Sequence, residues 1–165
     1  MTSRSTQSRK GDTAKSCDVD DLPDCVCGTL RMVTRAVTQI YDDAMRPCGL
    51  RVTQYGLLSR IERRGPISAG QLVGSLIADQ TTLARALKVL EKDGLIRRVP
   101  QADQRVKLIE LTDKGRKRLA QARRLWSQAQ ARMVGLIGRE QWRDVRARLG
   151  FVLGALGPAR AGGAE

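Results

Sequence analysis

Histidine is absent from this 165-residue chain, and its absence excludes a wide range of chemistry. Without an imidazole there is no histidine general base, no Ser–His or Cys–His nucleophile pair and no histidine-ligated metal site. A glycine-rich phosphate loop and clustered carboxylates are missing as well. We therefore expect neither an enzyme active site nor a cofactor.

Aromatic residues are also scarce, at 3% of the chain, although hydrophobic residues make up 41%. The core is therefore predicted to consist of Leu, Val, Ile and Ala side chains packed between helices. No apolar run reaches the roughly 18 residues that a membrane span needs. The polar residues 1–15 lack the apolar segment of a secretory signal. We expect a cytoplasmic protein outside the membrane, whose four cysteines are mostly reduced.

Positive charge is what the chain has in excess. Its net charge is +13 and its pI is about 10.6, and the excess is concentrated between Arg60 and Arg124. Such a balance suits a polyanionic partner, because each neutralised phosphate releases condensed counterions. Charge alone leaves open a generally basic protein with no nucleic-acid role.

Apolar residues recur at three- and four-residue steps in several segments, which is typical of amphipathic helices. Residues 23–46 form the first such segment, and Pro47 and Gly49 end it. Thr53 is predicted to cap the second helix, which Gly65-Pro66 breaks. Thr112 is predicted to cap a long helix that Gly138 interrupts before a final helix. The apolar stripes are Leu30, Val33, Val37, Ile40, Tyr41 and Ala44; Tyr55, Leu57, Leu58 and Ile61; Leu119, Ala122, Leu125, Ala129, Met133 and Leu136; and Trp142, Val145, Leu149, Val152, Leu153 and Leu156.

The segment from Ser68 to Thr112 has the pattern of a winged helix-turn-helix. Ser68 is expected to cap a short helix that continues through Leu76, and a stronger helix covers Asp79 to Asp93 and ends at Gly94. Two β-favouring runs, residues 95–99 and 106–111, then flank a turn at residues 100–104. The predicted fold class is mainly α with a small β-ribbon.

The helix at residues 79–93 has the composition of a DNA-reading helix. Leu83, Ala86, Leu87 and Leu90 share one side, whereas the other sides carry Gln80, Thr81, Thr82, Arg85, Lys88 and Lys92. Gln80 can pair with adenine and Arg85 with guanine in the major groove, and Lys88 is placed to contact phosphate. An ordinary solvated helix face is the alternative interpretation.

The turn between the two β runs favours the DNA-reading interpretation. Arg105 at the tip of a two-stranded ribbon can enter a minor groove, and Asp103 can hold its guanidinium in place. Arg97, Arg98 and Lys107 would contact the phosphate backbone nearby. A surface salt bridge between Asp103 and Arg105 is the alternative. The candidate DNA-binding residues are Ser68, Gln80, Thr81, Thr82, Arg85, Lys88, Arg97, Asp103, Arg105 and Lys107.

Three segments in this order resemble the MarR family (multiple antibiotic resistance regulators) of winged-helix proteins. They are GLRVTQYGLLSRI (49–61), TTLARALKVLEKDGLIRR (81–98) and DQRVKLIELTDKG (103–115), the last containing Asp-x-Arg followed by Leu-Thr-x-x-Gly. The resemblance covers residues 25–156. It implies a homodimer that places two reading helices in successive major grooves of a palindromic operator.

Composition and the resemblance together divide the chain. The polar residues 1–22 are expected to form a flexible arm and the Gly/Ala/Pro-rich residues 158–165 a disordered tail, with residues 23–157 forming the MarR-like domain. Within the domain, residues 52–112 would form the winged-helix DNA-binding lobe. Residues 23–47 and 113–157 would form dimerisation helices, with their apolar stripes mainly at the subunit interface.

The family suggests two kinds of signal. Some members sense a small anionic or aromatic effector, for which Arg31, Arg35 and Arg51 are candidate carboxylate ligands. Others sense oxidants through a cysteine near the start of the first helix, where Cys27 lies here, with Cys25 beside it. Arg31 and the helix start would lower the thiol pKa.

Other interpretations of the cysteines remain open. Two tyrosines that bond the sensor thiol in the oxidant-sensing subgroup would fall near Arg31 and Val52, and neither residue is a tyrosine. Cys25 and Cys27 could equally be small packing residues. Zinc bound together with Cys17 and Cys48 is disfavoured, because the spacing is not that of a Cys-x-x-Cys knuckle.

The sequence therefore predicts a sequence-specific transcriptional regulator, a homodimeric repressor that a small-molecule ligand releases from DNA. Redox sensing through Cys27 and non-specific architectural DNA binding are the alternatives.

Overall fold

The computed structural model describes residues 24–76, 80–99 and 107–157, with no side-chain description at 74–76. It divides into two units, residues 1–36 and residues 37–165. The helices are α1 (Val26–Met45), the short 3₁₀ helix η2 (Arg46–Cys48), α2 (Val52–Arg64), α3 (Ala69–Leu76), α4 (Gln80–Lys92), α5 (Asp113–Ile137) and α6 (Arg139–Leu156). The strands are β1 (Ile67–Ser68), β2 (Ile96–Val99) and β3 (Leu108–Leu111). Among the described residues, no helix is both long and apolar enough to cross a membrane.

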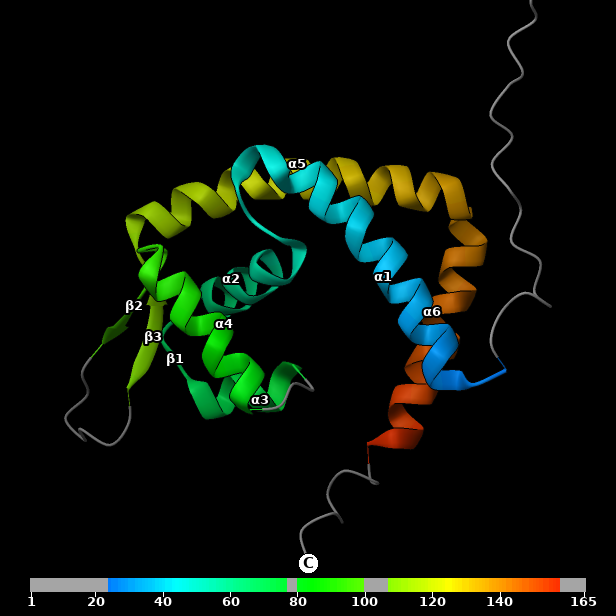
Figure 1. Cartoon of the computed structure of the whole chain (residues 1–165), viewed down its shortest axis with the longest axis horizontal. Coiled ribbons are helices and arrows are strands. Elements are labelled where there is room, and N and C mark those ends of the chain that lie inside the picture. The colour runs from blue at the N-terminus through cyan, green and yellow to red at the C-terminus, as the bar shows by residue number, and fades with distance from the viewer. Residues whose placement is uncertain (1–23, 77–79, 100–106, 158–165) are drawn as a thin grey trace, which may run out of the picture. The chain divides into compact units, whose positions relative to one another are not determined.

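The strands form one small antiparallel sheet in the order β1-β3-β2. Ile96 pairs with Leu111 and Val99 with Leu108, so β2 and β3 form the predicted ribbon. Figure 1 shows α2, α3, α4 and this sheet gathered near the start of α5. The predicted fold class, mainly helical with a small β-ribbon, is confirmed.

The prediction that Thr53 caps the second helix is wrong, because the N-cap is Arg51, two residues earlier, and α2 begins at Val52. The free N–H of Val52 donates to the carboxylate of Asp42, 2.7 Å away, and the N–H of Arg51 donates to the side chain of Gln54 at 2.9 Å. A carboxylate from α1 therefore satisfies the start of α2. A contact between two helices cannot be recognised from the residues next to the cap alone.

Local signals correctly located the starts of α3 and α5 and the break between α5 and α6. Ser68 caps α3, its hydroxyl accepting from the N–H of Gln71 at 3.3 Å while the Gln71 side chain accepts from the N–H of Ser68 at 3.0 Å. Thr112 caps α5, accepting from the N–H of Gly115 at 3.0 Å. Gly138 separates α5 from α6.

The core of the second unit is aliphatic, as the composition predicts. Its members, all buried, are Met45, Cys48, Leu50, Leu57, Leu58, Ile61, Ile67, Leu72, Leu83, Leu87, Leu90, Leu95, Ile96, Ile109, Leu111, Leu119 and Ala122. They come from the end of α1 and from every later element up to α5. A smaller cluster of Tyr41, Ala129 and Met133 joins α1 to α5. This core holds the back of α4 and therefore determines which of its faces is exposed.

Candidate functional site

The polar face of α4 is exposed as the sequence predicts. Leu83, Leu87 and Leu90 are buried in the core, whereas the residues of the other faces, Gln80, Thr81, Thr82, Arg85 and Lys88, are exposed. The helix thus presents amide, hydroxyl, guanidinium and ammonium groups outward over about two turns. These are the groups that bind base edges and phosphates in a major groove.

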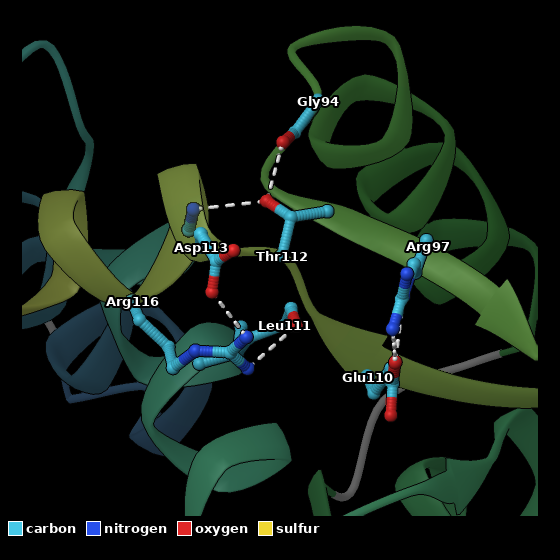
Figure 2. Close-up of polar contacts among 8 residues, drawn as sticks. Gly94, Arg97, Glu110, Leu111, Thr112, Asp113 and Arg116 are labelled. Carbon is cyan, nitrogen blue, oxygen red and sulfur yellow. Dashed lines mark hydrogen bonds and ion pairs between the residues drawn. The ribbon is translucent and has the colours of Figure 1, made fainter.

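The strands add basic residues whose charge is partly neutralised. Arg97 faces Glu110 across the ribbon and donates to its carboxylate at 2.6 Å. Arg98 pairs with Glu91 of α4 at 3.2 Å. Figure 2 shows the Arg97–Glu110 pair beside the start of α5. Both pairs lie at the surface, so they mainly orient the two guanidinium groups and contribute little to stability.

Not all of the predicted site residues can be placed. Asp103 and Arg105 lie outside the described residues, as do residues 100–102, 104 and 106. Lys107 is described and exposed just before β3. The Ser68 hydroxyl is already engaged with Gln71, which identifies Ser68 first as a helix cap.

The start of α5 carries interactions that the sequence did not reveal. Arg116 donates to the carbonyl of Leu111 at 2.9 Å and pairs with Asp113 at 2.6 Å (Figure 2). The hydrogen bond from Arg116 lowers the pKa of the Asp113 carboxyl, and the charge of the same guanidinium adds to the effect. Asp113 is also the first residue of α5, where a negative charge complements the helix dipole.

A cavity of about 400 Å³ lies between α2 and α5 and was also missed from the sequence. Its lining residues are Val52, Tyr55, Gly56, Ser59, Arg60, Arg63, Arg123 and Trp126. The rings of Tyr55 and Trp126 stack with their centres 5.5 Å apart. Arg123 bonds to Glu62, which raises the pKa of its guanidinium. The cavity therefore combines an aromatic wall with several arginines.

One polar atom beside this cavity has no hydrogen-bond partner within the described structure. It is the hydroxyl oxygen of Ser59, which is buried. Buried polar groups are usually paired.

Arg51, which the sequence suggested as a carboxylate ligand, instead pairs with Asp42 at 3.3 Å. Spacing in the sequence could not reveal the cavity, because its lining residues from α2 and α5 lie at least 60 positions apart in the chain.

The cysteines fall into two groups. Cys25 and Cys27 are exposed, and Cys27 is the second residue of α1. Arg31, further along α1, is exposed as well. Cys48 is buried, and its thiol donates to the carbonyl of Met45 at 3.0 Å. Among the described residues, no group of three or more metal-ligating side chains comes together.

The last helix leaves large apolar side chains exposed. On α6, Val145, Leu149, Phe151, Leu153 and Leu156 are exposed, and Phe151 is 79% exposed. No residue of α6 is buried. A helix with this many exposed apolar side chains is typical of an interaction surface.

Comparisons with known proteins agree with this geometry. The model of the MarR family matches residues 50–107. The transcriptional regulator PecS of Dickeya dadantii (strain 3937) is 34% identical over 102 residues, which cover 59% of this chain and 61% of PecS. The chain spans about three fifths of the length of the curated relatives it matches.

Solved structures extend the similarity. The structure of the M. tuberculosis transcriptional regulator MosR in complex with DNA is 37% identical, with a TM-score of 0.75, and the match covers 83% of this chain and 99% of that one. A mutant of MarR from E. coli complexed with operator DNA shares the fold, with a TM-score of 0.70 at 23% identity, covering 75% of this chain and 90% of that one. The family model and the near-complete match to MosR together show that the chain belongs to the MarR family.

Proposed function

We propose that this protein is a sequence-specific DNA-binding transcriptional regulator that acts as a homodimeric repressor in the cytoplasm. The observation that carries the proposal is the exposed polar face of α4, held outward by the burial of Leu83, Leu87 and Leu90. It is supported by MosR and the E. coli MarR mutant, both of which were crystallised with DNA. Gln80 and Arg85 would read bases, and Lys88 and Lys107 would contact phosphates.

The exposed apolar side chains of α6 support the homodimer. Burying Leu149, Phe151 and Leu153 away from water lowers the free energy of the system. A second copy of the chain carries the same apolar surface and can therefore cover it. Two reading helices related by a twofold axis would then require a palindromic operator, with half-sites about one helical turn apart.

The DNA-binding proposal can be tested by fluorescence anisotropy. A duplex would first be selected from a random library with the full chain, and its affinity compared with that of random DNA. Arg85→Ala should weaken binding to the selected duplex by about 1–3 kcal/mol and relax the preference at particular bases. Arg132→Ala, which removes an exposed arginine from α5, is the matched control. If wild-type protein binds selected and random DNA equally well, it is an architectural binder, and the regulator proposal is wrong.

The cavity between α2 and α5 supports release by a small aromatic acid. Its volume of about 400 Å³ suits a ligand of one or two rings. Tyr55 and Trp126 would contact the ring. The Nε of Arg63 donates to the carbonyl of Ser59 at 3.3 Å, and its terminal nitrogens would bind the carboxylate. A panel of substituted benzoates should change the tryptophan fluorescence and lower DNA affinity, and Arg63→Ala should weaken both effects. If no benzoate binds, this mode of release is contradicted.

Exposure of Cys25 and Cys27 favours a second candidate, release by oxidation. Cys27 lies in the first turn of α1, where its thiol is open to an oxidant. Within the described structure neither thiol is buried, which supports this candidate over a packing role. Peroxide should release DNA from the wild type but not from Cys27→Ser or Cys25→Ser in a gel-shift assay. Equal release from all three proteins would exclude the switch.

A further inference from the structure

The C-terminal end of α4 is fastened to the start of α5 through three successive backbone carbonyls. The ammonium of Lys114 donates to the carbonyl of Asp93 at 2.7 Å, and the hydroxyl of Thr112 donates to that of Gly94, also at 2.7 Å. The N–H of Thr112 donates to the carbonyl of Leu95 at 3.1 Å. Figure 2 shows Thr112 bonded to Gly94 on one side and to the first turn of α5 on the other. We name Thr112, Lys114 and Gly115 the α5 clamp.

The clamp holds a turn that is already well defined. Gly94 has a φ of +68°, the N–H of Leu95 donates to the carbonyl of Leu90, and the N–H of Gly94 donates to that of Glu91. This is a Schellman motif, the common glycine ending of a helix. The positive charge of Lys114 lies at the negative end of the α4 dipole, where it is favourable.

Gly115 brings the two backbones into direct contact. A Cβ atom at this position would lie 2.0 Å from the carbonyl oxygen of Leu95, which is backbone and cannot rotate away. The first turn of α5 therefore packs closely against the end of α4, with no side chain between them. Such an interface transmits a displacement because it has no room in which to absorb one.

Beyond the clamp, α5 continues to the cavity. Arg123 and Trp126, two and three turns further along, form part of its wall. We propose that Thr112 and Lys114 are positioning residues that hold the C-terminal end of α4 to α5, so that a movement of α5 changes how α4 meets DNA. This inference rests on the proposed function, in which α4 reads DNA and the α2–α5 cavity receives the signal.

Substitution of Lys114 can distinguish positioning of α4 from support of the fold and from simple phosphate contact. Its side chain is exposed and α5 keeps its Thr112 cap without it, so Lys114→Met should leave the fold intact. A lysine that only contacts phosphate would affect selected and random DNA equally. A positioning lysine affects the selected duplex alone, because random DNA binding does not depend on the precise register of α4.

The experiment measures two affinities and one melting temperature for each variant. The affinities are those for the duplex selected by the wild type and for random DNA of the same length, at fixed salt. Lys114→Met should lower the ratio of the two affinities by about fivefold, which is the change expected from losing the net contribution of one hydrogen bond. Lys117→Met removes the same charge from an exposed position one turn along α5 and should leave the ratio unchanged. Thr112→Val, which removes the hydroxyl, should also lower the ratio. Thr112→Ser, which keeps the hydroxyl, should have the wild-type ratio.

Each outcome has a defined meaning. A reduced ratio in Lys114→Met, with an unchanged melting temperature and an unaffected Lys117→Met, supports the clamp. Equal effects of the two lysine variants overturn it, as does failure of Thr112→Ser to restore the ratio. If wild-type protein shows no preference for any selected duplex, the proposed function fails and the clamp proposal fails with it. A normal wild-type preference that survives Lys114→Met overturns the clamp proposal alone.

Discussion

Gly115→Ala adds one methyl group where the first turn of α5 packs against the backbone at the end of α4. The new Cβ atom would begin 2.0 Å from the carbonyl oxygen of Leu95. An ordinary carbon–oxygen contact is about 3.3 Å or longer. The start of α5 and the end of α4 must therefore separate by roughly 1.3 Å, which strains the hydrogen bonds of the α5 clamp.

Two opposing terms decide the size of the effect. Alanine is favoured over glycine inside a helix by about 0.5–1 kcal/mol. Forcing an extra carbon into a closely packed contact costs about 1–3 kcal/mol, and the upper end applies here because the contacted atom belongs to the backbone. We expect a net loss of about 2 kcal/mol in the free energy of unfolding. For a chain of this size the melting temperature should fall by about 4–8 °C.

Thermal unfolding followed by circular dichroism at a fixed protein concentration measures this loss. Gly135→Ala is the matched control, because Gly135 lies in the same helix and a Cβ atom there would meet nothing within 4 Å. It should gain the helix preference of alanine alone, and its melting temperature should rise by about 1–4 °C. If Gly115→Ala melts at or above the control, the close contact between α4 and α5 is not as described.

Three further predictions concern the supports of the site. Asp113→Asn should melt below the wild type near neutral pH and approach it as the pH falls. The Arg116 bond lowers the pKa of this carboxyl below its ordinary 3.8, so its stabilisation is present above that value and is lost on protonation; a constant gap from pH 7 to pH 2 would contradict this. Ser59→Ala should leave the melting temperature unchanged or raised, because it removes a buried hydroxyl that has no partner among the described residues; a clear fall would reveal a partner. Asp42→Ala should cost about 1 kcal/mol in urea unfolding through loss of the α2 cap, whereas Asp43→Ala, at an exposed position, should cost less.

Sequence patterns were sufficient for the helices and for the exposed face of α4. Period and capping signals are local, so leucines at 83, 87 and 90 predicted the buried side and thereby the polar front. The Thr112 cap and the strand pair were also within reach, because the cap joins residues 3 positions apart and the paired strand residues are only 9 to 15 positions apart. The roles assigned to Arg85 and Lys88 on DNA remain predictions, and Asp103 and Arg105 lie outside the described residues.

The contacts between distant segments could be found only in three dimensions. The carboxylate of Asp42, rather than the predicted Thr53 hydroxyl, accepts from an N–H at the start of α2. It can do so because the chain turns at η2 and brings α1 beside that N–H. The α2–α5 cavity and the α5 clamp arise in the same way, from helices that the aliphatic core brings together. A glycine at 115 looks like any helical glycine until the carbonyl of Leu95 is found against it. Residues close in the chain reveal periodicity and caps, whereas packing alone decides which separated groups come into contact.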